Sequence, residues 1–321
     1  MSKHGSMAYQ VTKILQDKFA PGESKHKAKE SGEDNDFIFG FNSIRTYIRE
    51  ATNFCNWCKE VFGVRTVAAC KPYVKRYIQN VRKKNGERYS ASSLATKASA
   101  IAKLYGVQKV KTPERKLEDI TRSRKPREMD KHYRPENHSD LERFCEATGT
   151  RRCEVSRIMG TQYEIRDRHL YVKIIGNQAK GGRPREIPVI KDARFVLDLM
   201  RKAGKEKVFQ KIPDACDVHA HRASYAATLY KLVARPLEVC EKDPFFDKKR
   251  GVLCPDSVYR CRGSRRGIWY DKKALLIISR ALGHNRIDVV ACHYLYSLDE
   301  EIRNMPIRIK DGQSCTTFLQ P

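Results

Sequence analysis

Residues 148–155 read TGTRRCEV and place Arg151 one helical turn before the acidic residue Glu154. Further short islands follow in the second half of the chain: AKGG at 179–182, HAHR at 219–222, LGH at 282–284 and a single tyrosine, Tyr294. Together they supply arginine, lysine, histidine and tyrosine side chains in a fixed order. That inventory suits one reaction, in which a tyrosine hydroxyl attacks a DNA phosphodiester while cations hold the charge that builds on phosphorus.

The charge of the whole chain indicates a polyanionic partner. Its 321 residues include 64 Lys and Arg against 38 Asp and Glu, a formal net charge of +26. Nucleic acid and anionic membrane are the two candidates for such an excess. No apolar run approaches the roughly 20 residues of a membrane helix, and no N-terminal segment has the layout of a signal peptide. We therefore expect double-stranded DNA as the partner, no membrane, and a cytoplasmic location.

The cysteines favour a reducing compartment. There are 11 of them, an odd number scattered from Cys55 to Cys315, which argues against a secreted disulfide framework. The stretch CNWC at 55–58 has CxxC spacing, but no second Cys or His pair follows at a zinc-finger distance. Because this stretch falls in an amphipathic helical run, we interpret its cysteines as packed thiols and predict no metal site.

The first third of the chain predicts a small helical domain over 37–108. Residues 1–36 are mostly polar and are expected to form an extension, with a loop or disordered segment at 23–36. Apolar residues at helical spacing predict three helices, from about 42, from Pro72 to about 85, and from about 92 to Gly106. Their outward basic residues are candidate DNA contacts: Lys71, Lys75, Arg82, Lys83 and Arg88.

A basic linker over 109–135 is predicted to separate this domain from a mixed α/β domain over 136–300. The second domain is expected to contain a helix from Ser139, a helix through Glu154, and a hairpin with strands at 170–174 and 186–190. The turn of the hairpin carries Lys180 and two further candidate DNA contacts, Arg183 and Arg185.

The chain after residue 192 is predicted to be mostly helical. The exception is 243–266, which is rich in Pro, Gly and charge. A helix over 271–282 brings His284 to its C-terminal end, and residues 301–321 form a tail.

Phosphodiester transfer without a metal needs a nucleophile that can stay covalently attached, fixed cations around phosphorus, and an acid for the leaving oxygen. Tyrosine, the bidentate fork of arginine, and lysine or histidine fill these places. The sequence has neither a carboxylate cluster suited to two divalent ions nor a P-loop lysine. We therefore expect no cofactor.

The islands resemble the motifs of the tyrosine recombinase (phage integrase) family over about residues 42–300. TGTRRCEV is similar to its first arginine box, AKGGRPREIP at 179–188 to its lysine hairpin, HAHRASYAA at 219–227 to its HxxR box, and ALGH at 281–284 to its LGH box. The resemblance implies a mainly α fold with a small antiparallel β-hairpin or sheet. It also implies a C-shaped two-domain clamp, in which a helical core-binding (SAM-like) domain joins a mixed α/β catalytic domain.

The resemblance implies a role for each matched residue. Tyr294 would attack the scissile phosphate and form a 3′-phosphotyrosyl link. The groups that hold the phosphate oxygens would be Arg151, Arg222 and His284. The remaining matched residues would act on protons or on neighbouring groups: Lys180 by protonating the leaving 5′-hydroxyl, His219 by assisting proton transfer at the tyrosine, and Glu154 by orienting its neighbours.

The resemblance implies partners and a setting as well. Strand exchange would occur in a homotetramer on two DNA sites, without ATP or metal, and with an accessory DNA-bending or directionality factor. The protein would be associated with the nucleoid, in a bacterial, phage or mobile-element context, where it would integrate or excise DNA.

Some alternatives stay open from the sequence. Tyr294 follows His284 one position later than is common in the family, so Tyr296 is an alternative nucleophile. The span from Arg222 to His284 is longer than usual, and we assign the excess to an insertion near 235–266, whose stretch CRGSRR at 261–266 is a candidate phosphate contact. Two other functions fit the same residues: DNA relaxation by a type IB topoisomerase, and DNA binding by a catalytically silent architectural protein.

Overall fold

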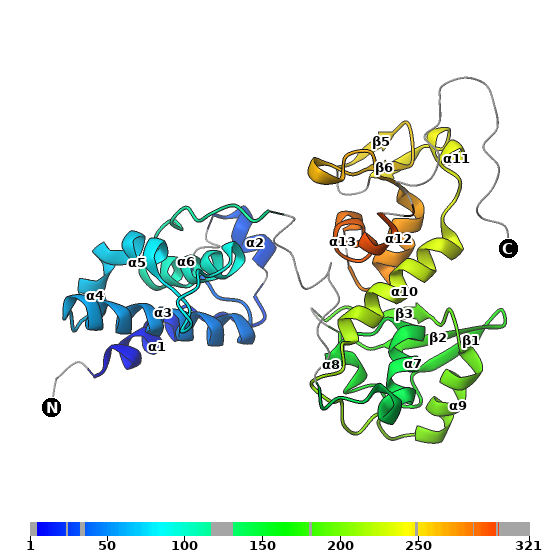
Figure 1. Cartoon of the computed structure of the whole chain (residues 1–321), viewed down its shortest axis with the longest axis horizontal. Helices are drawn as coiled ribbons and strands as arrows, with labels where there is room; N and C mark the ends of the chain where they lie inside the picture. Colours follow the sequence, from blue (N-terminus) through cyan, green and yellow to red (C-terminus); the bar gives the residue numbers. More distant parts are fainter. Residues whose placement is uncertain are drawn as a thin grey trace. The chain divides into compact units, whose positions relative to one another are not determined.

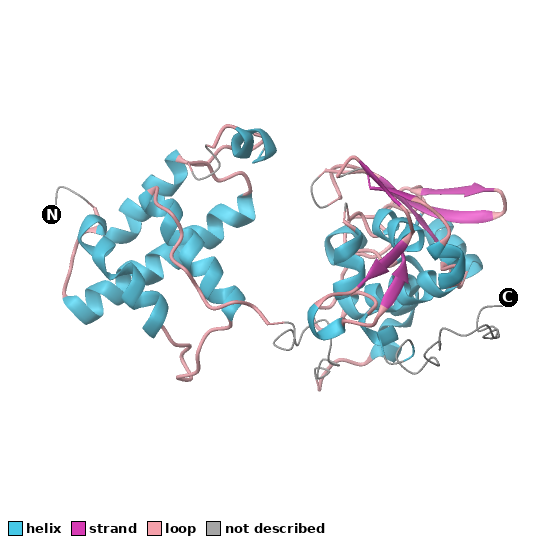
Figure 2. Cartoon of the chain, turned by 90° about the horizontal axis from the view of Figure 1, so that it is seen from above, coloured by secondary structure: helices cyan, strands magenta, loops and turns pink. Residues whose placement is uncertain are grey.

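The computed structural model describes residues 5–23, 25–32, 36–116, 131–179, 182–247, 250–284, 286–299 and 301. The chain divides into two compact units, residues 1–119 and 120–321. The first unit is built from helices, and the second combines helices with short strands (Figure 1, Figure 2). The prediction of a mainly helical fold with small antiparallel sheets is confirmed, whereas the C-shaped clamp stays a prediction.

The first unit consists of α1 Met7–Asp17, α2 Lys25–Glu30, α3 Phe41–Phe62, α4 Val67–Cys70, a 3₁₀ turn Lys71–Tyr73, α5 Val74–Asn80 and α6 Ala91–Tyr105. Helix α3 is central, because both α1 and α6 pack on it. Its buried face includes Phe54, and it ends at Gly63, whose φ of 70° suits glycine. The hydroxyl of Ser90 caps α6 by accepting from the backbone of Ser93 at 3.2 Å.

Three predictions for the first unit are wrong. Residues 7–17 are not part of a polar extension, because Met7, Val11 and Leu15 recur at helical spacing and α1 buries them in the core of the unit. Helix α2 lies where a loop or disordered segment was expected. The helix predicted after Pro72 ends at Asn80 rather than near residue 85, since Val81 adopts an extended backbone with ψ of 133°.

The cysteines of the CNWC stretch lie on the inner face of α3. Cys55 and Cys58 are free thiols with no exposed surface. Burial raises the pKa of Cys55 to about 12, so both sulfurs are protonated and pack as apolar groups.

The second unit begins with a 3₁₀ turn, Pro135–His138, followed by α7 Ser139–Thr148, α8 Arg152–Val155, β1 Tyr163–Arg166, β2 His169–Ile174, β3 Arg185–Pro188, α9 Ala193–Ala203 and α10 Val218–Val233. The three strands form an antiparallel sheet in the order β1-β2-β3, in which Val172 lies opposite Ile187. Leu170, Val172 and Ile174 are buried, as their alternation predicts. Strand β1 was not predicted.

The remaining elements are α11 Leu237–Glu241, β4 Phe245–Asp247, β5 Val252–Cys254, β6 Val258–Arg260, a 3₁₀ turn Gly263–Arg265, β7 Trp269–Asp271, α12 Lys272–Ala281, α13 Ile287–His293 and a 3₁₀ turn Tyr296–Leu298. Strand β4 pairs with β5, and β6 pairs with β7. The stretch 243–266 is therefore the predicted exception to the helical pattern, although its strands were not predicted. Its strands have three residues each, too few for an alternating pattern to be recognised.

Helices α10 and α12 hold the second unit together. Helix α10 contacts α7 and α12, and α12 also contacts β3 and α13. Their apolar side chains share one core with the sheet, in which Tyr225, Leu275 and Ile278 are fully buried. This packing brings the first residues of α10, the end of α12 and the end of α13 together.

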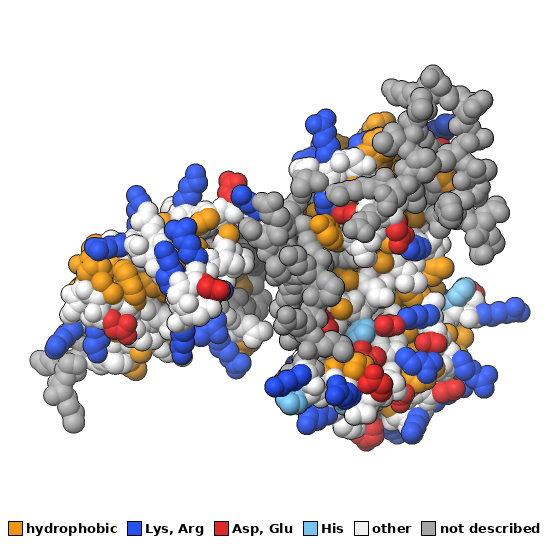
Figure 3. Space-filling view, viewed as in Figure 1, with side chains coloured by type: hydrophobic (Ala, Val, Ile, Leu, Met, Phe, Trp, Pro, Cys, Tyr) orange, Lys and Arg blue, Asp and Glu red, His pale blue; other side chains and the backbone are white. Residues whose placement is uncertain are grey.

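The candidate DNA contacts of the first unit are all exposed: Lys71, Lys75, Arg82, Lys83 and Arg88. Figure 3 shows lysine and arginine side chains spread over the visible face of this unit. Lys83 pairs with Glu87 at 2.7 Å. Contact between these side chains and DNA stays a prediction. Among the described helices, none combines the length and the apolar character that a membrane span requires.

Candidate active site

Tyr294 lies at the C-terminal end of α13, and its side chain is turned into the second unit. Only 6% of the residue is exposed. Its hydroxyl lies 3.3 Å from Nε of Arg222 and 3.2 Å from Nε2 of His284. The candidate nucleophile therefore contacts two of the residues that the sequence proposed as phosphate ligands.

Arg222 is the most deeply buried arginine of the site, with 2% of its surface exposed. Its Nη1 donates to the carbonyl of Gly149, and its Nη2 donates to the carbonyl of Leu282. Burial lowers its pKa to about 10, although the neighbouring Tyr294 hydroxyl opposes this shift. Since 10 is well above neutral pH, the guanidinium remains a fixed cation beside the tyrosine.

Arg151 meets Arg222 at a shared acceptor. Its Nη2 donates to the carbonyl of Leu282 at 2.8 Å and to that of Gly283 at 3.3 Å. The LGH island therefore presents its backbone carbonyls to both arginines. The shared Leu282 carbonyl fixes the two guanidinium groups relative to each other, although 131 positions separate Arg151 from Leu282.

Gly149 allows the segment before Arg151 to approach α10 closely. Its φ of 57° ends α7 in the left-handed region. A Cβ at this position would lie 2.4 Å from Cδ1 of Tyr225, a ring buried on α10. The glycine therefore lets its own carbonyl reach Arg222.

The two predicted histidines both lie against Tyr294. Nε2 of His284 also lies 3.3 Å from Nη2 of Arg222, and its backbone N–H donates to the carbonyl of Ser279 at 2.7 Å. The ring of His219, in the first turn of α10, meets the Tyr294 ring edge-on at a centroid distance of 5.5 Å. The structure thus gathers Arg151, His219, Arg222, His284 and Tyr294 into one cluster.

Glu154 holds two arginines, and one of them corrects a prediction. Arg185, expected to contact DNA, donates from Nη1 and Nη2 to the Glu154 carboxylate at 2.7 and 2.6 Å and from Nε to the Ala281 carbonyl at 2.8 Å. Only 7% of its side chain is exposed. Arg185 is therefore an internal partner of Glu154, because β3 turns it toward the end of α12 instead of toward the tip of the hairpin.

The Glu154 carboxylate is fully buried and carries its charge. Burial alone would raise its pKa, but hydrogen bonds and charge from Arg185 and Arg151 lower it to about 2. Arg151 contributes both a backbone N–H bond of 2.7 Å and an Nη1 bond of 2.9 Å. Glu154 therefore fixes the plane of the Arg151 guanidinium.

The predictions for Arg183 and Lys180, the other two basic residues of the hairpin, are not tested. Arg183 is exposed, which agrees with a DNA contact without testing it. Lys180, the candidate acid, lies outside the described residues.

The candidate phosphate contact at 261–266 is wrong for Arg265. This side chain is 2% exposed, its Nε donates to Asp299 at 2.7 Å, and its Nη1 donates to the Ala291 carbonyl at 2.6 Å. Its guanidinium also lies over the ring of Tyr296 at 5.5 Å. Tyr296, the alternative nucleophile, therefore contacts a different arginine from Tyr294.

The comparisons with known proteins concern the fold. No protein-family model matches the sequence, and a search of curated proteins finds no match. Two solved chains are similar, both of the XerH site-specific recombinase bound to difH substrate. The post-cleavage complex has a TM-score of 0.50 and 13% identity over 92% of this chain and 94% of that chain. The chain has the fold of a site-specific recombinase.

The second similar chain is the pre-cleavage complex of XerH, with 12% identity over 93% of this chain and 95% of that chain. Its TM-score of 0.36 is too low to support any argument. The recombinase fold spans both units of the chain, so the family resemblance seen in the sequence motifs is confirmed at the level of the fold.

Proposed function

We propose that this protein is a site-specific DNA recombinase that cleaves and rejoins DNA through a 3′-phosphotyrosyl intermediate. One observation carries the proposal: the Tyr294 hydroxyl lies within hydrogen-bond distance of both Arg222 and His284. The likeness in fold to the XerH site-specific recombinase supports it as well.

The proposed reaction forms one bond and breaks one. The oxygen of Tyr294 attacks the scissile phosphorus, and the bond from phosphorus to the 5′ oxygen breaks. The tyrosine proton passes to His219, whose ring lies against that of Tyr294, and the 5′ oxygen takes a proton from Lys180. Because the tyrosyl ester conserves the phosphodiester bond, a 5′-hydroxyl can reverse the step and rejoin the strand without ATP.

The two arginines supply the charge that the reaction needs, and His284 adds a hydrogen bond. The transition state carries extra negative charge on the phosphate oxygens, which a fixed guanidinium stabilises best in a site that excludes water. Arg222 is held by Gly149 and Leu282, and Arg151 is held by Glu154 and Leu282. Since these partners fix both forks before DNA arrives, little reorganisation is required during the reaction.

The proposed partners follow from this chemistry and from the charge. The substrate is double-stranded DNA, held by the basic surfaces of both units, and strand exchange takes place in a homotetramer on two DNA sites. The reaction integrates or excises a mobile element. The net charge of +26 supports a DNA substrate, and the XerH chain with the similar fold is itself bound to difH substrate.

A covalent trapping experiment tests the proposal. The probe is a library of duplexes with a random central segment and a nick that lets the cleaved end diffuse away, so that rejoining is prevented. The wild-type chain, without added divalent ion, should form a protein–DNA adduct that survives denaturing electrophoresis, enriched for one sequence.

Matched tyrosine variants identify the nucleophile in the same assay. Tyr294→Phe should abolish the adduct, and Tyr296→Phe should retain it. Equal trapping of all sequences by the wild type would favour topoisomerase activity instead. DNA binding without any adduct would favour an architectural protein.

A further inference from the structure

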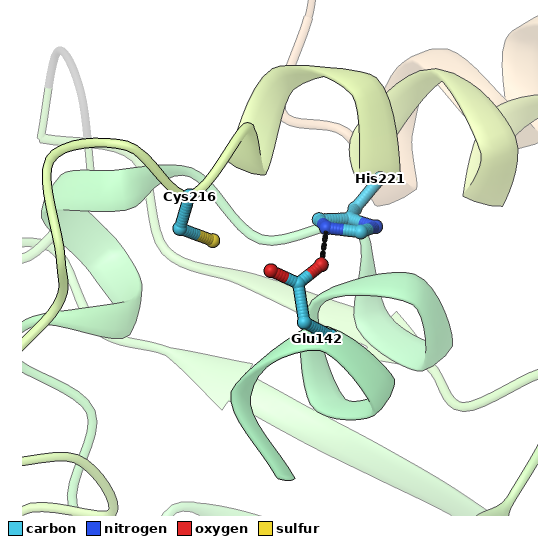
Figure 4. Close-up of side chains that lie close together, drawn as sticks. All are labelled: Glu142, Cys216 and His221. Atoms are coloured by element: carbon cyan, nitrogen blue, oxygen red, sulfur yellow. Dashed lines mark ion pairs between the residues drawn. The ribbon is translucent and has the colours of Figure 1, made fainter. Parts of the chain in front are cut away.

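A cluster of side chains of the types that bind metals lies on the side of α10 that faces α7, away from Tyr294. Glu142 projects from α7, Cys216 lies in the loop before α10, and His221 lies in the first turn of α10. Figure 4 shows the three side chains directed toward one another. Their ligand atoms all lie within 4.8 Å of one another, and no other group of three such residues does so in the described part of the chain.

We propose that Glu142, Cys216 and His221 bind one zinc ion. The three residues offer a carboxylate oxygen, a thiolate sulfur and an imidazole nitrogen, a set that suits zinc and disfavours magnesium and calcium. In a tetrahedral site with zinc bonds of about 2.0–2.3 Å, ligand atoms lie about 3.5 Å apart. From the observed limit of 4.8 Å, closing around an ion shortens the longest distance between ligand atoms by about 1.3 Å or less, which shifts of under about 1 Å in each side chain provide.

The surroundings of His221 match those of a zinc ligand. Its Nε2 pairs with Glu142, while its Nδ1 lies 3.4 Å from Oε1 of Glu146, one turn further along α7. A carboxylate on the second ring nitrogen is the usual companion of a zinc-bound histidine, since it fixes the ring orientation and makes the ligand nitrogen more basic. Lys191 in turn pairs with Glu146.

The position of Cys216 is set before any ion binds. Arg152 donates from Nη1 to the Pro213 carbonyl at 2.8 Å and from Nη2 to the Cys216 carbonyl, which holds the loop in place. Cys216 is 1% exposed. The buried thiol of Cys216 hydrogen-bonds with Tyr133 and lies close to both Glu142 and His221.

The charges of the proposed site balance. One Zn²⁺ with a thiolate, a carboxylate and a neutral imidazole is neutral, which suits side chains that are only 18% exposed for Glu142 and 15% for His221. Zinc binds the thiolate form of cysteine, so metal binding would release the thiol proton of Cys216. The Tyr133 hydroxyl donates to the other oxygen of Glu142, and the fourth coordination position of the zinc would be open to a water.

The proposed ion is structural and does not take part in the chemistry at Tyr294. His221 faces α7, whereas its neighbour Arg222 faces Tyr294. By joining α7 to the start of α10, the ion would hold the turn that carries His219 and Arg222. Metal content is measured without DNA, so this inference can fail while Tyr294 remains the nucleophile.

The test uses the full chain with any affinity tag removed. After loading with Zn²⁺ and desalting, the wild type should retain one equivalent of zinc by elemental mass spectrometry. Loading with Co²⁺ instead should give a sulfur-to-cobalt charge-transfer band and the visible bands of a tetrahedral site. The spectrum reports thiolate coordination without any substitution, so it stands even where a variant fails to fold.

Variants assign the ligands. Cys216→Ser and His221→Ala should lose the bound zinc, and Glu146→Gln should bind it about 10–100-fold more weakly. The matched control is Cys153→Ser, which removes an exposed thiol of α8 and should retain one equivalent. Less than a fifth of an equivalent in the wild type, no thiolate band with cobalt, or equal zinc in Cys216→Ser would each overturn the proposal.

Discussion

Replacement of Arg185 by methionine should destabilise the second unit by about 2–3 kcal/mol. The estimate comes from the carboxylate that it contacts. The pKa of Glu154 falls from its ordinary value of 4.5 to about 2. This pKa difference of about 2.5 units, at about 1.36 kcal/mol for each unit, corresponds to about 3 kcal/mol of folding free energy. Most of this disappears with Arg185, which supplies two of the charged hydrogen bonds, although Arg151 remains.

The cost should depend on pH in a defined direction. Because the pKa of Glu154 is lower in the folded chain, the ionised carboxylate stabilises the fold above about pH 4.5, and this stabilisation is lost as the pH falls toward about 2. The difference between wild type and Arg185→Met should therefore be full at pH 7 and shrink below pH 4.5. Urea denaturation of the full chain, followed by circular dichroism at pH 7 and at a pH below 4.5, measures this difference in the free energy of unfolding.

Arg183→Met is the matched control, since it removes an exposed arginine from the same hairpin. It should change the free energy of unfolding by no more than about 0.5 kcal/mol. The double variant Glu154→Gln with Arg185→Met should be less destabilised than the sum of the single variants by at least about 1 kcal/mol. Equal stability of Arg185→Met and Arg183→Met at pH 7 would refute the assignment of Arg185 to Glu154.

Three further predictions concern the site and the DNA. Arg222→Lys should lower the rate of adduct formation by at least about 100-fold in single-turnover trapping, because the single nitrogen of an ammonium cannot bond Gly149, Leu282 and Tyr294 together. A near-normal rate would show that the planar guanidinium of Arg222 is not needed. Gly149→Ala should lower the free energy of unfolding in urea by about 2–4 kcal/mol, since its Cβ would lie 2.4 Å from Tyr225. The control Gly251→Ala, at a residue with a φ of 65° and open space around it, should lower it by about 1 kcal/mol. Equal losses would contradict this reasoning. Lys75→Ala should reduce the slope of log affinity against log salt by about 0.9 in DNA titrations if Lys75 neutralises a phosphate, and an unchanged slope would remove it from the interface.

The sequence predicts local structure where one rule dominates. The alternation at 170–174 gives β2 its buried face, and Gly106 ends α6 with a φ of 61°. Helix α1 was missed because its few apolar residues lie among polar ones, and their spacing matters more than their number. The pairs of three-residue strands after α11 carry no periodic signal, since their pairing partners are set by the surrounding fold.

The candidate site was also predicted in part from the sequence. The islands indicated which side chain types belong together. The structure brings Arg222, His284 and Tyr294 into contact and places Arg151 on the Leu282 carbonyl that Arg222 also bonds. The sequence could not separate Arg183 from Arg185, two arginines in one basic hairpin. The difference depends on the Ala281 carbonyl and the Glu154 carboxylate, which come from distant parts of the chain. The zinc ligands were also missed, because the spacing of Glu142, Cys216 and His221 matches none of the metal motifs that sequence reasoning looks for.

Peptide mapping of the trapped protein–DNA adduct tests the central claim most directly. After digestion with a protease and a nuclease, mass spectrometry should find the residual 3′-phosphonucleotide on the peptide that contains Tyr294, with fragment ions that place it on that phenolic oxygen. A nucleotide on Tyr296 or on any other residue, or cleavage that leaves no nucleotide on the protein, would contradict the account.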